Sequence, residues 1–354
     1  MAGRVTLQQV ADAAGVSRGT ASVILNDRPG ARFSPETAAR VRAAADALGY
    51  RPNRLATALL QGDTQTLALV SADLSTDRFA ADLVRGASEG AGRAGQLLFV
   101  AQADGLAGPV ERLIHRLVDH GVDGFVYAVN SNREVRVPEV LRDQQVVVLN
   151  GVPVAGPDGT WPTPPAIAPD DERAGALAGE LLRASLGARE PARRRVLLLG
   201  RVVRESSADD PLPGIAGALR ERGLRADLRA HGVPLAHVAC PWWPAEARSA
   251  LDEYLTRHPA PGAICALNDR AAIGAYDALR RHGLRVPHDV SIVSFDGSEL
   301  ADWTDPPLSS LRLPYLQMGA RAVELLLAGA PDGHVEHVAL GSPHLGSLTA
   351  AEPA

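Results

Sequence analysis

The sequence predicts a small all-α head followed by a larger α/β core, whose two lobes are built on parallel sheets. In the first 50 residues, apolar side chains recur at helical spacing. From Thr66 onward, short continuous apolar runs such as TLALV, GFVYAV and SIVSFD alternate with helical stretches. Apolar strands separated by helices are typical of parallel sheets that are covered on both faces. The length of 354 residues allows more than one packed unit.

Charge is distributed unevenly along the chain. Residues 1–62 carry eight Arg against four Asp or Glu, whereas the remainder carries 28 Arg against 37 acidic residues. A small basic head on an acidic body favours a nucleic-acid-binding module at the N-terminus. A chance fluctuation in a small domain would also produce an excess of this size.

The cysteine content and the hydropathy indicate the compartment. Cys240 and Cys265 are too few for a disulfide framework, and their apolar surroundings predict buried thiols. The first ten residues lack the apolar stretch of a signal peptide. No run approaches the ~20 apolar residues of a membrane span. We therefore expect a cytoplasmic protein without a membrane association.

The head is predicted to contain three short helices. The first follows Thr6, which forms a capping box with Gln9, and it ends at Gly15. The second runs from about Ser17 to Leu25, and the third runs from the Ser-Pro-Glu start at residue 34 to Gly49. The link between the first two helices is so short that they must cross sharply, which is the spacing of a helix-turn-helix.

The domain limits follow from changes in composition. Residues 1–50 form the helical head, residues 51–65 a short hinge helix with a linker, and residues 66–354 the core. A Pro-rich interval, VPVAGPDGTWPTPPA, divides the core near residue 160. We expect lobe 1 to comprise about 66–161 and 296–325, and lobe 2 to comprise about 162–295 and 326–354.

Several short motifs point to enzymes, but their context contradicts that interpretation. Residues 15–19, GVSRG, match the nucleophile elbow of serine hydrolases, which requires a strand before the serine, whereas here a helix precedes it. Residues 90–95 match G-x-G-x-x-G with the helix and the strand in reversed order. The histidines show no zinc spacing. We expect no enzyme activity, no cofactor and no metal site.

The second helix carries the stronger functional pattern. Its outward face consists of Arg18, Gly19, Ser22 and Val23. The second helix of a helix-turn-helix lies in the major groove of DNA, where Arg binds guanine in bidentate fashion and hydroxyl groups suit phosphate oxygens. The alternative is the solvated face of a small helical domain.

At these residues the chain resembles the LacI-type (LacI/GalR, lactose repressor-like) bacterial transcription regulators. VTLQQVADAAGVSRGTASVILN is similar to the helix-turn-helix of that family, and SPETAARVRAAADALGYRPNRLATAL is similar to its third helix and hinge. The similarity continues through LALVSADL, GVDGFV and ALNDRAAIGAYDALRRHGLRVPHDVSIVSFDGSELADWTDPPLSSLRLP. The resemblance implies a DNA-binding head, a hinge helix and a two-lobed core like that of periplasmic sugar-binding proteins.

The resemblance also implies which residues contact DNA. Arg18, Gly19 and Val23 would read bases, and Val23 stands where relatives often have Arg, so it offers only apolar contact, for instance to a thymine methyl group. Leu59 would wedge into the minor groove and bend the DNA, or would pack between hinge helices. The other matching positions are Thr6, Ser17, Thr20, Ser22, Asn26, Tyr50, Asn53 and Arg54.

The effector site implied by the resemblance lies at the carboxyl ends of the strands, where open α/β sheets bind ligands. Carboxylates and amides beside an aromatic wall bind sugar hydroxyls. Each polar residue taken alone is also compatible with a helix cap. The expected effector residues are Asp73, Ser75, Phe79, Asp170, Trp243, Asn268, Asp269 and Asp296.

The predicted function is that of a homodimeric repressor that binds a near-palindromic operator in double-stranded DNA. A sugar or related metabolite between the lobes would modulate its affinity. Two departures from the family concern this effector: Pro211 replaces a common Arg, and Thr76-Asp77-Arg78-Phe79 replaces the usual Asn-Pro-Phe-Phe. The alternatives are a DNA-binding regulator that responds to no ligand and a solute-binding protein, which the basic head disfavours.

Overall fold

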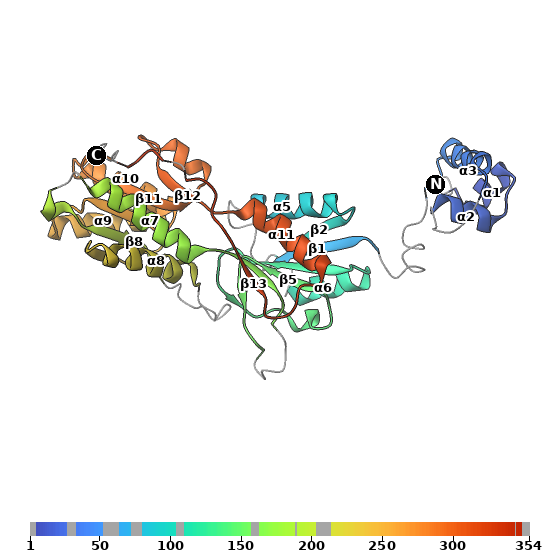
Figure 1. The fold of residues 1–354 in the computed structure, drawn as a ribbon, viewed down its shortest axis with the longest axis horizontal. Coiled ribbons are helices and arrows are strands. Elements are labelled where there is room, and N and C mark those ends of the chain that lie inside the picture. The colour runs from blue at the N-terminus through green and yellow to red at the C-terminus, as the bar shows by residue number, and fades with distance from the viewer. Residues whose placement is uncertain are drawn as a thin grey trace. The chain divides into compact units, whose positions relative to one another are not determined.

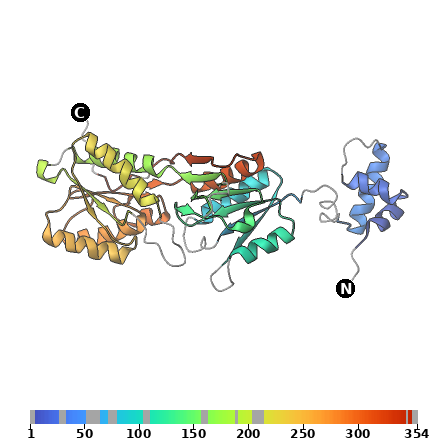
Figure 2. The same ribbon diagram turned by 90° about the horizontal axis from the view of Figure 1, so that it is seen from below.

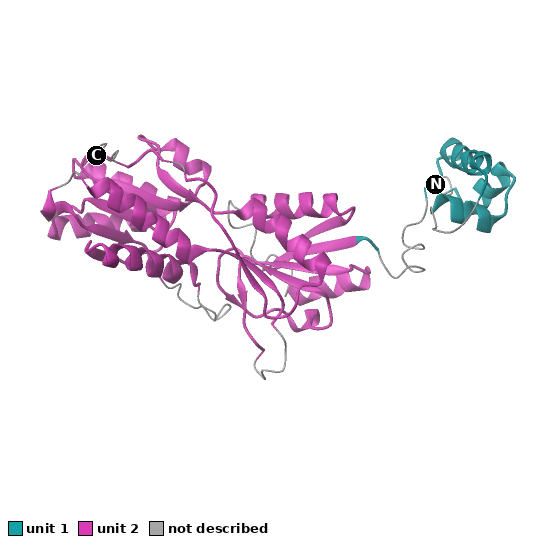
Figure 3. Ribbon diagram, in the orientation of Figure 1, with its two compact units in different colours: residues 1–65 teal, residues 66–354 magenta. Residues whose placement is uncertain are grey.

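The computed structural model describes residues 5–26, 33–51, 64–71, 80–103, 110–156, 163–187, 190–202, 214–343 and 345–348. Two compact units, Met1–Gln65 and Thr66–Ala354, make up the chain (Figure 3). Several residues with predicted roles lie outside the described ranges, namely Asn53, Arg54, Leu59, Asp73, Ser75, Phe79 and Pro211.

The first unit contains three helices, α1 (Leu7–Ala14), α2 (Arg18–Leu25) and α3 (Pro35–Leu48). The predicted capping box is present, since Thr6 N donates to Gln9 Oε1 over 2.8 Å and Gln9 N donates to Thr6 Oγ1 over 3.4 Å. Gly15 and Gly49 end α1 and α3 with φ of 65° and 66°, a backbone conformation that suits glycine. The three helices share a small apolar core made of Val10, Ala11, Ala14, Ala21, Ile24, Val41 and Ala45.

The first lobe of the second unit is a six-stranded sheet in the order β13-β7-β5-β3-β1-β2 (Figure 1). All of its described strand pairs are parallel. Its strands are β1 (Thr66–Ser71), β2 (Leu97–Gln102), β3 (Gly124–Ala128), β5 (Val146–Leu149), β7 (Ala166–Pro169) and β13 (Val335–Val338). A short separate ladder joins β4 (Glu134–Val135) to β6 (Val152–Pro153).

Helices cover both faces of this sheet, which explains its continuous apolar strands. Leu67 and Leu69 of β1 face α5 (Ala80–Arg93) and α11 (Tyr315–Ala328), whereas Ala68 and Val70 face the opposite layer. That layer consists of α6 (Val110–Asp119) and the short 3₁₀ helix η2 (Glu139–Leu141).

The second lobe is a five-stranded sheet in the order β12-β11-β10-β8-β9, again parallel in its described pairs. Figure 2 shows helices on both sides of this sheet. Its strands are β8 (Val196–Leu199), β9 (Leu235–Val238), β10 (Ala263–Ala266), β11 (Ser291–Asp296) and β12 (Ser309–Arg312). The helices α7 (Asp171–Leu186) and α8 (Ala216–Ala230) cover one face, and α9 (Pro244–Arg257) and α10 (Asp269–Arg281) cover the other. Two 3₁₀ helices complete the lobe, η3 (Pro191–Arg193) and η4 (Glu299–Trp303).

The crossings between the lobes differ from the predicted limits. The predicted limits place β7 and β13 in lobe 2, but both strands pair in the sheet of lobe 1; the same limits place β12 in lobe 1, but it pairs with β11 in the sheet of lobe 2. The Pro-rich interval near residue 160 therefore lies between two strands of one sheet. Composition suggested a boundary there, whereas strand pairing decides where the chain changes lobes.

Strand β2 also differs from the expected buried strand. It lies at the edge of its sheet, with a partner on one side only. Leu97, Phe99 and Val100 are 57%, 43% and 52% exposed. Leu97 and Phe99 point to the α6 side of the sheet and Val100 to its α5 side, and none of the three is covered within the described part of this single chain. We call this apolar sheet edge, formed by Leu97, Phe99 and Val100, the β2 surface.

Two helix pairs approach each other closely through glycines. A Cβ on Gly86 or Gly319 would lie 2.0 or 2.2 Å from a carbonyl oxygen of the facing helix, so only glycine allows α5 and α11 to pack at this distance. Gly175 and Gly223 serve the same purpose between α7 and α8. The second contact places the first turns of α7 and α8 side by side. Asp171 of α7 and Arg220 of α8 lie in this region.

None of the helices in the described ranges is long and apolar enough to span a membrane.

Candidate DNA-binding surface and interlobe pocket

The turn between α1 and α2 is a helix start. Ser17 is the N-cap of α2, and its Oγ accepts a hydrogen bond from Thr20 N over 3.0 Å and contacts Thr20 Oγ1 at 2.9 Å. A helix precedes Ser17, whereas a nucleophile elbow requires a strand there. The Ser17 hydroxyl therefore caps the N-terminus of α2 and is not a nucleophile, as the sequence context predicts.

The N-terminal turn of α2 presents Arg18 and Gly19 to solvent, and Ser22 and Val23 are half-buried one turn later. Asn26 at the C-cap donates from Nδ2 to the carbonyl of Ser22 over 2.8 Å. Arg18 and Gly19 thus lie at the N-terminal end of α2, where such helices contact bases, and Val23 lies in the next turn.

The remaining predicted head residues have structural contacts of their own. The Thr6 hydroxyl takes part in the capping box of α1, and Thr20 pairs with Ser17. Tyr50 is half-buried and packs against the apolar core of the head. A contact of these residues with DNA would add to these roles.

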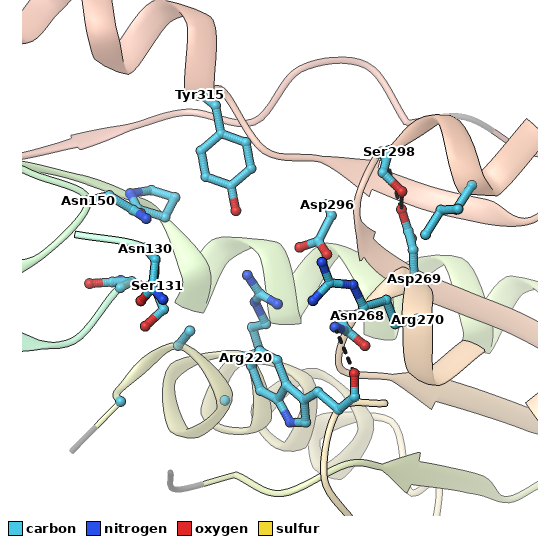
Figure 4. Close-up of a pocket in the computed structure, with 18 of the residues that line it drawn as sticks. Asn130, Ser131, Asn150, Arg220, Asn268, Asp269, Arg270, Asp296, Ser298 and Tyr315 are labelled. Atoms are coloured by element: carbon cyan, nitrogen blue, oxygen red, sulfur yellow. Dashed lines mark hydrogen bonds between the residues drawn. The ribbon is translucent and has the colours of Figure 1, made fainter. Parts of the chain in front are cut away.

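A pocket of about 860 Å³ lies between the two lobes of the core. It is bordered by loops that follow β3, β5, β10 and β11, at the carboxyl ends of both sheets, where the ligand site was expected. Figure 4 shows Asn130, Ser131, Asn150 and Tyr315 on one side of it, and Asn268, Arg270 and Asp296 on the other.

The structure brings together four of the five predicted effector residues that it describes. Trp243, Asn268, Asp269 and Asp296 line the pocket. Asp170 is absent from the lining, and its carboxylate instead caps α7 by accepting from Arg173 N over 2.9 Å. For this residue, the helix-cap alternative describes the geometry better.

Asp269 borders the pocket, but its carboxylate is occupied by the protein itself. Oδ1 accepts from the hydroxyls of Ser294 and Ser310 over 2.5 and 2.6 Å, and Oδ2 accepts from the amide and hydroxyl of Ser298 over 2.8 and 2.7 Å. Four donors fill the lone-pair positions of a carboxylate. Asp269 therefore fixes the loop after β11 and leaves no acceptor for a ligand.

The side chain of Asn268 also forms hydrogen bonds within the protein. Its Oδ1 caps α10 by accepting from Ala271 N over 2.8 Å, and its Nδ2 donates to Trp242 O over 3.3 Å. The ring of Trp243 lies 4.6 Å from the guanidinium of Arg270, at a distance typical of a cation–π contact. Asp296 has a positive φ of 108° at the end of β11 and belongs to the pocket lining.

Arg220 is the functional candidate that the sequence patterns missed. Its side chain is almost fully buried in the pocket wall, where Nε donates to Asp171 Oδ1 over 2.7 Å and Nη1 donates to Leu267 O over 2.6 Å. The guanidinium lies 4.7 Å from the centre of the Phe295 ring and 5.6 Å from that of Trp242.

Burial and charge oppose each other at this guanidinium. Burial lowers the pKa of Arg220, but the nearby carboxylates of Asp171 and Asp296, together with Tyr315, outweigh it and raise that pKa above its ordinary value. Arg220 therefore remains charged inside the pocket wall. Its position in α8 was a usable signal, since it falls on the buried stripe of Gly217, Leu224 and Leu228.

Comparisons with known proteins agree with this arrangement. Residues 6–53 match the family described as bacterial regulatory proteins, lacI family, and residues 215–345 match a periplasmic binding protein-like domain. The chain is 32% identical to the HTH-type transcriptional regulator MalR of Streptomyces coelicolor, over 98% of this chain and 97% of that protein. It is 30% identical to the HTH-type transcriptional regulator CelR of Thermobifida fusca, over 92% and 91%.

Solved structures show the same fold. A lac repressor dimer bound to operator and the anti-inducer ONPF aligns with a TM-score of 0.75 at 23% identity, over 99% of this chain and 100% of that one. A complex of the regulator CelR with cellobiose aligns with a TM-score of 0.62 at 26% identity, over 98% and 100%. The chain belongs to the lacI family of bacterial regulatory proteins and is a DNA-binding transcription regulator.

Proposed function

We propose that this regulator is a homodimeric repressor whose affinity for a near-palindromic operator is set by a small polyhydroxyl effector bound between the lobes. The observation that carries the proposal is a large polar and aromatic pocket at the carboxyl ends of both sheets, in a chain that also has a helix-turn-helix head. A ligand in such a pocket touches both lobes, so its binding is linked to how far they close.

The head would read DNA through the first two turns of α2. Arg18 would bind a guanine edge, Gly19 would allow a close approach of the backbone, and Val23 would contact a thymine methyl group. These assignments rest on the exposure of Arg18 and Gly19 and on the position of the three residues in α2. Contacts to the DNA backbone are proposed for Thr6, Ser17, Thr20, Ser22, Asn26, Tyr50, Asn53 and Arg54, with Leu59 in the minor groove.

Replacement of Arg18 tests the DNA-reading role. An operator is first selected from a pool of random duplexes with the full chain, and its affinity is then measured by mobility shift. Arg18→Ala is expected to weaken binding by about 1–3 kcal/mol and to relax the preference at one base position. Arg229→Ala, at an exposed arginine of α8, is the control that leaves binding unchanged. A loss of equal size on all sequences would show that Arg18 contacts only the backbone.

The effector is proposed to be a sugar. The rings of Trp242 and Trp243, the amides of Asn130 and Asn150, and the Asp296 carboxylate supply the mixed apolar and polar lining that carbohydrate sites use. The solved CelR structure that aligns with this chain holds cellobiose, which makes a disaccharide the first probe. Asp73, Ser75 and Phe79 remain predicted ligand contacts.

A regulator without a ligand is the second candidate, because Pro211 replaces a family arginine. A thermal-shift screen against cellobiose, maltose, ribose and nucleosides separates the two. A ligand that binds the folded state raises the melting temperature. A rise that depends on the concentration of one compound would therefore support the effector-responsive regulator. No shift with any of these compounds would favour the ligand-independent regulator.

The β2 surface is proposed to join two copies of this chain. An operator with twofold symmetry requires a protein with the same symmetry. Leu97 and Phe99 on one face of the edge strand and Val100 on the other are exposed apolar side chains, and a second copy packed around this sheet edge would remove them from water.

A further inference from the structure

The two lobes are joined beside the pocket by Asn132, which lies in lobe 1 between β3 and β4. Its carbonyl oxygen accepts hydrogen bonds from Ile215 N over 3.0 Å and from Ala216 N over 3.2 Å, at the start of α8 in lobe 2. Its side-chain Nδ2 donates to Asp171 Oδ2 over 2.8 Å, at the start of α7. One residue of lobe 1 thus contacts the first turns of two helices of lobe 2.

The same carboxylate holds the arginine of the pocket. Asp171 Oδ1 accepts from Arg220 Nε over 2.7 Å, while Oδ2 accepts from Asn132. Asn132, Asp171 and Arg220 are 3%, 1% and 3% exposed. The hydrogen bond between the lobes and the Arg220 guanidinium therefore share the buried Asp171 carboxylate. Movement of Asn132 thus alters the position of Arg220, and movement of Arg220 alters that of Asn132.

One acceptor in this arrangement lacks a donor. Asn132 Oδ1 is buried and has no hydrogen-bond partner in the described part of the chain, although Asn132 lines the pocket. A buried acceptor without a partner destabilises a protein, so a ligand that donates a hydrogen bond to it removes that unfavourable contribution. Arg220 Nη2 likewise donates to no described residue, whereas Nε and Nη1 are both engaged.

We propose that Asn132 is an interlobe latch, and that one effector hydroxyl binds between Asn132 Oδ1 and Arg220 Nη2. A hydroxyl group both donates and accepts, which matches an acceptor in lobe 1 and a donor in lobe 2. When the lobes separate, Asn132 moves away from Arg220 and one hydroxyl no longer reaches both. The effector therefore binds the closed state better and shifts the lobes toward closure. The hydroxyl part of this proposal rests on the proposed effector function.

The latch is tested on the full chain without a ligand. Arg112→Cys in α6 and Ala226→Cys in α8 place exposed labelling sites on the two lobes, while the native Cys240 and Cys265 are buried. The doubly labelled chain is mixed with an excess of unlabelled chain, so that most dimers carry one labelled copy and the spin labels report the interlobe distance within that copy. The labelled chain is expected to show one narrow distance distribution.

Asn132→Asp sets a second carboxylate against Asp171 and is expected to lengthen and broaden that distribution. Asn132→Ala, which buries no charge, is expected to broaden it less. The double variant Asn132→Asp with Asp171→Asn exchanges donor and acceptor and is expected to restore the original distribution. Gln145→Glu, the same kind of exchange at an exposed site of lobe 1, is the control. Unchanged distances in both Asn132 variants, or no recovery in the double variant, would overturn the latch.

Cellobiose and maltose test the hydroxyl subsite by calorimetric titration. Asn132→Ala is expected to weaken the sugar that binds by about tenfold, since one hydrogen bond is lost. Equal affinity in Asn132→Ala and the unmodified chain would overturn the subsite and leave the proposed effector function standing. If neither sugar binds to the unmodified chain, both the hydroxyl subsite and the sugar effector are overturned. The interlobe distance measurements then still test the latch.

Discussion

At the residue scale, the chain places two opposite charges inside a protein wall. The side chains of Arg220 and Asp171 are 4% and 0% exposed, Arg220 Nη1 also donates to Leu267 O, and Asp171 Oδ2 also accepts from Asn132 Nδ2. Removing charges from water is costly, so such a pair is tolerated only where further hydrogen bonds satisfy both partners. Loss of one partner leaves the other charge buried and uncompensated.

Asp171→Ala is therefore expected to lower the free energy of unfolding by about 3–5 kcal/mol, measured by urea denaturation. Glu253→Ala is the matched control, because Glu253 pairs with Arg257 at the surface, where both side chains are mostly exposed. Such pairs contribute about 1 kcal/mol or less. A similar small loss in both variants would contradict the assigned burial of the Arg220 charge.

The buried thiols predict a dependence of stability on alkaline pH. Burial raises the pKa of Cys265 to about 12 and that of Cys240 to about 11, whereas a thiol in an unfolded chain has a pKa of ~8.5. The folded state keeps protons that the unfolded state releases, so this contribution is complete below pH ~8.5 and is lost as pH rises toward the folded values.

Unfolding by urea between pH 7 and pH 10 is expected to show falling stability above pH ~8.5. Cys265→Ala lowers stability at pH 7 by removing buried atoms, but its stability should fall less steeply with pH than that of the unmodified chain. Parallel pH profiles for the two proteins would show that Cys265 titrates normally.

At the element scale, pairs of helices in both lobes depend on glycine at their contacts. Gly319 of α11 faces Leu83 of α5, and an added Cβ would lie 2.2 Å from the Leu83 carbonyl oxygen. Gly92 belongs to the same helix α5 but has open space where its Cβ would stand. Substitution at Gly319 therefore tests close helix packing, whereas substitution at Gly92 tests only the conformational freedom of glycine.

Gly319→Ala is expected to destabilise the chain by about 1–3 kcal/mol through overpacking. Gly92→Ala is expected to stabilise it by about 0.4–1 kcal/mol, because alanine restricts the unfolded chain and meets no neighbour. Thermal unfolding of both variants against the unmodified chain measures the two effects. An unchanged melting temperature in Gly319→Ala would mean that α5 and α11 can move apart with little loss of stability.

At the scale of the whole molecule, the β2 surface is the proposed contact between two copies of the chain. Phe99→Asp and Val100→Asp place a charge in the proposed contact between two copies and are expected to convert dimers to monomers. Light scattering after size exclusion measures this mass. Leu327→Asp is the control, because Leu327 is also an exposed apolar residue of the same lobe, at 45% exposure. A dimer that survives both β2 substitutions would place the interface elsewhere.

The sequence by itself determined the local elements and the family of this protein. The start of α2 at Ser17 and the ends of α1 and α3 at Gly15 and Gly49 depend on residues within one turn of each other. Caps and periodicity are local interactions, and their residues stand together in the sequence. The alternation of apolar strands with helices determined the parallel α/β core in the same way.

Tertiary structure alone decided which side chains form the pocket wall and what remains for a ligand. Asp171 meets Asn132 across 39 residues and Arg220 across 49, and no local pattern relates such positions. The same holds for Asp269, where three serines from distant strands and loops fill a carboxylate that the sequence suggested for the effector. Hydrogen-bond partners of a buried polar group depend on how strands and helices pack, so they become visible only in the folded chain.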